Sequence, residues 1–94
     1  MIALFAIVAN MNSKHRKTLA AVFAKPTSGT VEWARIESLL VAAGCRIIEG
    51  RGSRVRFEHE GRITTFHRPH PGKEAKPYQV EEVRTFLEML GVKP

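Results

Sequence analysis

The chain has 94 residues, enough for one domain with a small core and too few for two. Hydrophobic residues make up 44% of it, an ordinary fraction for a globular protein that argues against wholesale disorder. The formal net charge of +6 favours a polyanionic partner, with RNA or DNA as the first candidate. Many small basic proteins bind no nucleic acid, so the charge alone leaves this open.

Residues 1–10 form an apolar segment with no basic residue in front of it. The segment is too short for a transmembrane helix and lacks the charged start of a signal peptide, so we expect no membrane association. Met11 then opens a polar stretch, and we expect the working domain to begin there, with residues 1–10 as an upstream extension. An extra strand or helix that docks on the body is the alternative.

Two helices are expected before the first strand. The first runs from a Ser13 cap to about residue 24, so residues 11–30 form an additional helix and a linker. The second begins near Glu32 and ends at Gly44. Its apolar residues follow the i, i+3, i+4, i+7 spacing of a helix packed on a core: Ile36, Leu39, Leu40 and Ala43. Trp33 is expected to anchor the core rather than to stack on a base.

Three strands and a last helix follow. Residues 46–49 indicate a short strand, and residues 50–67 indicate a β-hairpin that turns at Glu60-Gly61. The last helix is expected from about Gln79 to Leu90. This order predicts an α+β domain in which helices cover one face of a three-stranded antiparallel sheet and leave the other face open.

Cys45 is the only cysteine, which excludes an intramolecular disulfide framework and indicates a reducing compartment. It follows a glycine at the expected start of a strand, where a small apolar side chain packs well. No catalytic triad pattern surrounds it, so we expect a core residue rather than a nucleophile.

A two-residue turn at Glu60-Gly61 determines which side chains of the hairpin share a face. In that register the side facing the core collects apolar residues: Val55, Phe57 and Phe66. Ile63, near the turn, is the exception. The opposite side collects polar residues: Arg54, Arg56, Thr65 and His67. Glu60 is not the preferred residue of such a turn, and a longer loop would shift these pairs.

The open face of the sheet therefore combines arginines, which suit phosphate, with a histidine that can act as general acid or base near neutral pH. Together they can hold an RNA phosphate, take a proton from the 2′-hydroxyl and stabilise the developing charge, with no metal or cofactor. A solvated basic hairpin without a ligand is the alternative. We expect RNA contacts from basic and hydroxyl side chains along the hairpin and the loop after it: Arg51, Ser53, Arg54, Arg56, Arg68, Lys73 and Lys76.

Three segments resemble the HicA family of bacterial toxins, over most of residues 31–94: Leu39 to Gly44, Gly52-Ser53 at the start of a strand, and His70-Pro71-Gly72-Lys73-Glu74-Ala75-Lys76-Pro77 before the last helix. The resemblance implies an α-β-β-β-α fold like that of double-stranded-RNA-binding domains, ribosome-independent cleavage of mRNA, and a cytoplasmic location. It also implies a HicB antitoxin that covers the active face. We expect a monomer when free and a hetero-oligomer with the antitoxin.

One position departs from the family pattern. The family's catalytic histidine usually follows the Gly-Ser pair, where this chain has Arg54, and arginine stays protonated at pH 7 and cannot act as a base. His67, opposite Arg54, is our first candidate for the replacement. His70 matches the family's His-Pro histidine and is the second, unless it only shapes the loop. His59 falls on the core side and is the weakest.

Two other functions remain open. If no histidine replaces the missing base, the chain is an RNA-binding or regulatory module that has kept the fold. A protein-interaction domain whose basic face docks an acidic partner is the third possibility.

Overall fold

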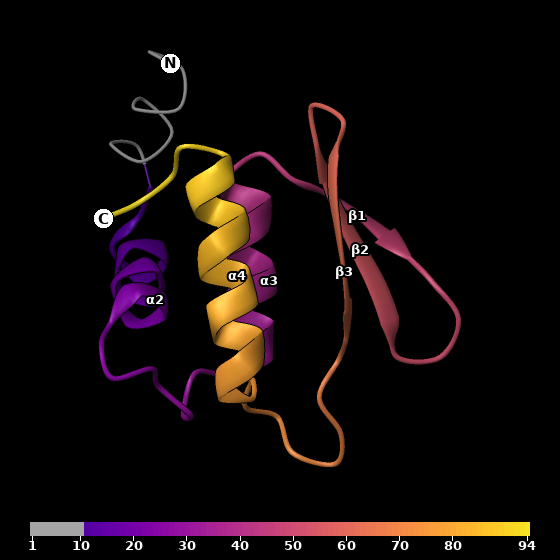
Figure 1. The fold of residues 1–94 in the computed structure, drawn as a ribbon, viewed down its shortest axis with the longest axis horizontal. Helices are drawn as coiled ribbons and strands as arrows, with labels where there is room; N and C mark the ends of the chain where they lie inside the picture. The colour runs from indigo at the N-terminus through magenta and orange to yellow at the C-terminus, as the bar shows by residue number, and fades with distance from the viewer. Residues whose placement is uncertain (1–10) are drawn as a thin grey trace.

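The computed structural model describes residues 11–94 (Figure 1), so the expectations for residues 1–10 lie outside the described part. The elements, in chain order, are α2 (Ser13–Phe23), α3 (Trp33–Ala42), β1 (Arg46–Glu49), β2 (Arg54–His59), β3 (Arg62–His67) and α4 (Pro77–Met89). The strands form one antiparallel sheet in the order β1-β2-β3. The expected architecture is confirmed: an N-terminal helix followed by α-β-β-β-α, as in double-stranded-RNA-binding-like folds.

Two helix starts differ slightly from the expected ones. The cap of α2 is Asn12, whose Oδ1 accepts a hydrogen bond of 2.8 Å from the N–H of His15, so the Ser13 cap was wrong by one position. Both residue types cap helices well, and here the asparagine comes first along the chain. Helix α4 begins at Pro77 rather than near Gln79, because proline fits the first turn of a helix, where its missing N–H costs nothing.

Helix α3 ends where the sequence predicts. Gly44 has a positive φ of 99°, and the N–H of Cys45 then returns to the carbonyl of Leu40 at 2.9 Å. This turn delivers Cys45 into the core with 6% of its surface exposed. Burial, helped by the nearby Glu58 carboxylate, raises the pKa of the Cys45 thiol to about 11. The expected role as a core residue is confirmed.

The core lies between the helices and one face of the sheet, and it includes Leu19 and Val22 of α2. Trp33 is 5% exposed, and its ring centroid lies 5.2 Å from that of Phe66 and 6.4 Å from that of Phe57, so its expected role as an anchor is confirmed. Helix α2 packs on α3 and α4, and Figure 1 shows it on their side away from the sheet. The additional helix therefore does not contribute to the open face.

The hairpin has the expected register, with Arg54 opposite His67. Glu60 and Gly61 have φ values of 50° and 83°, as in the two-residue turns that match the twist of paired strands. The Glu58 carboxylate accepts a hydrogen bond of 2.9 Å from the N–H of Gly61. This bond supports a turn whose first residue is not the preferred asparagine or aspartate.

Candidate functional site

The open face of the sheet presents basic side chains. Arg54 and Arg56 are exposed, whereas Val55 and Phe57, which alternate with them along β2, are fully buried. Neither guanidinium forms a hydrogen bond or an ion pair with any residue in 11–94. Both are therefore available to a phosphate group.

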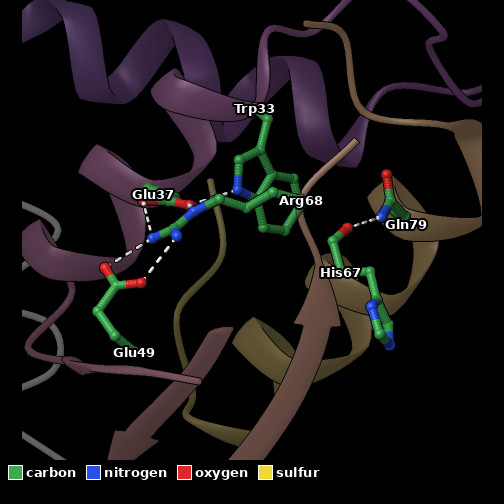
Figure 2. A network of polar contacts seen from close by, with 6 residues as sticks. All are labelled: Trp33, Glu37, Glu49, His67, Arg68 and Gln79. Atoms are coloured by element: carbon green, nitrogen blue, oxygen red, sulfur yellow. Dashed lines mark hydrogen bonds and ion pairs between the residues drawn. The ribbon is translucent and has the colours of Figure 1, made fainter. Parts of the chain in front are cut away.

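His67 lies at the end of β3 on this same face, directly opposite Arg54. Its ring is exposed, and its Nδ1 lies 3.3 Å from Oγ of Ser53, in the turn that precedes β2. Its backbone carbonyl accepts a hydrogen bond of 2.8 Å from the side-chain amide of Gln79 (Figure 2). His67 is thus held at ring and backbone, while its Nε2 has no partner among the described residues.

Gln79 was not among the residues expected from the sequence. It is 2% exposed, and its Oε1 accepts a hydrogen bond of 3.0 Å from the N–H of Lys76. One buried amide therefore joins the end of β3 to the first turn of α4 and closes the loop between them. The only signal in the sequence is a glutamine in a first helical turn, which is too common to indicate such a link.

Arg68 follows His67 and is engaged inside the protein (Figure 2). Its Nε lies 2.7 Å from Glu37 of α3, and its Nη1 and Nη2 lie 2.8 and 2.9 Å from the two carboxylate oxygens of Glu49 at the end of β1. The indole N–H of Trp33 donates to the same Glu37 carboxylate. We call Arg68, Glu37 and Glu49 the Arg68 clamp; it joins α3 to the ends of β1 and β3.

The Arg68 clamp contains more negative than positive charge. The hydrogen bonds that Arg68 donates to Glu49 and, second, to Glu37 hold the pKa of Arg68 above its ordinary value. The Arg68 guanidinium in turn holds the pKa of Glu49 below its ordinary value. Two carboxylates face one guanidinium, so the clamp presents no net positive charge. Arg68 is expected from the sequence to contact RNA; in the structure its donors face carboxylates instead.

The remaining expected residues are spread around the hairpin. Those in loops or turns are exposed: Arg51, His70, Lys73 and Lys76. Lys73 lies close to a carboxylate, with its Nζ 3.9 Å from Glu32. His59 is on the core side, as the register predicts: its ring is 16% exposed and Nδ1 donates to the carbonyl of Gly44 at 2.9 Å. The residues that the structure brings together are Ser53, Arg54, Arg56 and His67.

Two further properties concern the described part of the chain. No group of three or more His, Cys, Asp or Glu side chains in residues 11–94 could hold a metal ion. None of the helices α2 to α4 has the length and apolar character needed to cross a membrane.

Comparison with known proteins gives one match. The model of a family described as HicA toxin of bacterial toxin-antitoxin matches residues 33–92, which is more than half of the chain. The matched part begins at Trp33 and contains α3, the sheet and α4, and α2 lies before it. No curated protein and no solved structure matches the chain.

Proposed function

Because the chain belongs to the HicA toxin family, as the resemblance in its sequence predicts, we propose that this toxin of a toxin–antitoxin pair is an endoribonuclease that cleaves mRNA. The observation that carries the proposal is the placement of His67. It is exposed, lies opposite Arg54, and shares the open face with Arg56. A general base and two phosphate-binding cations are thus presented to one substrate surface.

In the proposed reaction, Nε2 of His67 takes the proton of a 2′-hydroxyl, and the 2′-oxygen attacks the adjacent phosphorus. The bond between phosphorus and the 5′-oxygen breaks, and that oxygen takes a proton from solvent or from His70. The products are a 2′,3′-cyclic phosphate and a 5′-hydroxyl end. If Nδ1–H of His67 donates to Oγ of Ser53, the Nε2 lone pair is free for this role.

Arg54 takes a different role from the histidine that the family usually has at this position. A guanidinium cannot accept the proton, but it can stabilise the charge that builds up on the phosphoryl oxygens, together with Arg56. Residues directly opposite across an antiparallel pair have Cβ atoms about 5 Å apart, so the base can move from one strand to the other without a change of fold.

The same surface suggests how the toxin is neutralised. A HicB-like antitoxin that presents acidic side chains to Arg54 and Arg56 would cover the face that binds RNA. We propose that the free toxin is a monomer, that it forms a hetero-oligomer with this antitoxin, and that it acts in the cytoplasm, where mRNA is found.

The test compares the His59→Ala, His67→Ala and His70→Ala variants in cleavage of a labelled RNA. We expect His67→Ala to lose about 10² to 10⁴ in rate, the usual contribution of a general acid–base group, with RNA binding nearly unchanged. His59→Ala is the control, because this histidine lies on the core side of the hairpin. Cleavage by the wild type should persist in EDTA and leave a cyclic phosphate end.

Other results of these assays would support a different catalytic residue or a different function. If only His70→Ala is inactive, the base lies in the loop; if all three variants keep full activity, the acid–base mechanism is wrong. Arg54 in the histidine position favours a second candidate, an RNA-binding module without a base, and RNA binding without cleavage by the wild type would support it. Affinity for an acidic protein without affinity for RNA would support a protein-interaction domain.

A further inference from the structure

A second surface lies between the outer edge of β3 and α4, next to the basic face. A hollow of about 490 Å³ lies there. Four large apolar side chains are exposed among residues 11–94, and three of them line this hollow, each with more than half of its surface exposed: Ile63, Tyr78 and Met89. Exposed apolar side chains that are gathered at one place, rather than scattered singly, are a feature of interaction surfaces.

The backbone of β3 adds unpaired hydrogen-bonding groups to this surface. The N–H of Arg68 donates to the carbonyl of Ser53 at 2.8 Å, which marks a hydrogen-bonded pair of the ladder between β2 and β3. Such pairs alternate along an antiparallel ladder, so the N–H and C=O groups of Ile63 and Thr65 point away from β2. His67 continues this alternation: its carbonyl also points away from β2 and accepts the hydrogen bond from the side-chain amide of Gln79.

Sheet edges are commonly protected from pairing by charge, proline or a covering segment. β3 carries neither a charge nor a proline from Ile63 to Phe66. Its edge is the last of the sheet, and the hollow lies alongside it. The outward backbone groups of Ile63 and Thr65 are therefore accessible to a further strand.

Charge indicates what this strand would carry. Glu82 lines the hollow and has no hydrogen-bond or ion-pair partner in the described part of the chain. Glu81 also lines the hollow, but its Oε2 accepts a hydrogen bond of 3.1 Å from Oγ1 of Thr27. Arg84, the one basic residue of α4, turns away and donates to the carbonyl of Val22 at 3.0 Å. This groove is thus acidic in a basic protein, which disfavours RNA and favours a basic ligand.

We propose that the groove between β3 and α4 binds an extended segment of a partner protein, which pairs with β3 as a fourth strand. Its apolar side chains contact Ile63, Tyr78 and Met89, and a lysine or arginine side chain pairs with Glu82. Main-chain bonds to Ile63 and Thr65 supply affinity, and the groove supplies the preference for sequence. The proposal is independent of RNA cleavage on the open face.

The test selects linear twelve-residue peptides from a random displayed library against the full chain. We expect the enriched peptides to alternate apolar residues with lysine or arginine. Tyr78→Glu and Met89→Glu should each weaken a selected peptide at least tenfold. The matched control is Val41→Glu, since Val41 is 50% exposed but lies on α3 outside the groove, and it should leave binding unchanged.

Two measurements sharpen the assignment. Two versions of a selected peptide can be made, one N-methylated at the odd-numbered backbone nitrogens and the other at the even-numbered ones. Only one of the two sets of N–H groups faces β3, so only one of the two methylated peptides should lose binding. Glu82→Lys should lower affinity for basic peptides about tenfold. No enrichment, or peptides that bind Tyr78→Glu as well as the wild type, would overturn the proposal. So would self-association of the chain that Met89→Glu abolishes, because the occupant would then be a second copy.

Discussion

Arg56 lies in the β2–β3 hairpin and Arg68 directly follows it, but the surroundings of the two side chains differ. Arg56 stands on the open face of the sheet without a partner among the described residues, whereas Arg68 is bound by the carboxylates of Glu37 and Glu49. Both count equally toward the net charge of +6. The capacity of such a protein to attract a polyanion therefore depends on which of its cations are already paired with carboxylates inside the fold.

The two regions also differ in what they contribute. Arg54 and Arg56 are exposed and have no hydrogen-bond or ion-pair partner among the described residues, so we expect them to contribute little to stability. The Arg68 clamp joins three elements next to His67 and holds the strand end that presents the imidazole. Arg54 and Arg56 are thus placed where a ligand can reach them, whereas the Arg68 clamp positions the end of β3 that carries His67.

The largest effect is expected in the folding stability of an Arg68 variant. Arg68→Ala leaves Glu37, whose side chain is 18% exposed, without its charged partner, and we expect a loss of about 1–3 kcal/mol in the free energy of unfolding. For a domain of this size the melting temperature should fall by about 5–15 °C. Thermal unfolding followed by circular dichroism measures this.

The matched control is Arg56→Ala, which should change the melting temperature by no more than about 2 °C, because an exposed side chain without partners is removed. Arg68→Lys should lie between the wild type and Arg68→Ala, since lysine keeps the charge and loses the planar fork. Equal melting temperatures for Arg56→Ala and Arg68→Ala would contradict the distinction between the two regions.

The fold was largely predictable because its signals are local and agree with one another. The register of β2 and β3 follows from one turn, Glu60-Gly61, and from the need to bury Val55, Phe57 and Phe66 together. Helix ends were correct within about two residues. The errors came from neighbouring residues that cap or start a helix equally well, as at Asn12 and Pro77.

The candidate site was predictable only where it follows the strands. The pairing of Arg54 with His67 is a consequence of register. The ion pairs of Arg68 could not be predicted in this way, because Glu37 and Glu49 reach Arg68 from α3 and β1. No pattern along the chain relates these elements to the end of β3. The role of Gln79 depends in the same way on a contact between β3 and α4.

A smaller effect is expected in the salt dependence of RNA binding. Each phosphate neutralised on a single strand contributes about 0.7 to the slope of log K against log salt concentration. Arg56→Ala should lower the slope by about this amount, for all RNA sequences alike, because a phosphate contact carries no base information. Arg68→Ala, assayed well below its melting temperature, should leave the slope unchanged.

Filter binding between low and physiological salt gives both slopes. If Arg68→Ala lowers the slope as much as Arg56→Ala does, Arg68 exchanges its carboxylate partners for RNA, and the contact expected from the sequence is made after all. A flat salt dependence of the wild type would remove RNA as the natural ligand.

The smallest effect is expected in acid. The Arg68 guanidinium holds the pKa of Glu49 below its ordinary value of 4.5, so the unfolded chain binds a proton at this carboxyl before the folded chain does. The stabilisation is therefore fully present above about pH 4.5 and is lost as the pH falls through the lowered pKa. Glu49 is exposed to solvent, which screens the interaction and keeps the effect small.

Urea unfolding of the wild type and Glu49→Gln from pH 3 to pH 7 isolates this carboxyl. The difference in midpoint between the two proteins should be constant above pH 5 and should shrink as the pH falls toward 3. Glu58→Gln serves as a comparison, because the pKa of Glu58 is lowered by the N–H of Gly61 and by Arg46 rather than by the Arg68 clamp. In an Arg68→Ala background, Glu49→Gln should no longer change the midpoint at any pH, whereas Glu58→Gln should keep its effect. A Glu49 effect that survives without Arg68 would place the stabilising contact of Glu49 outside the clamp.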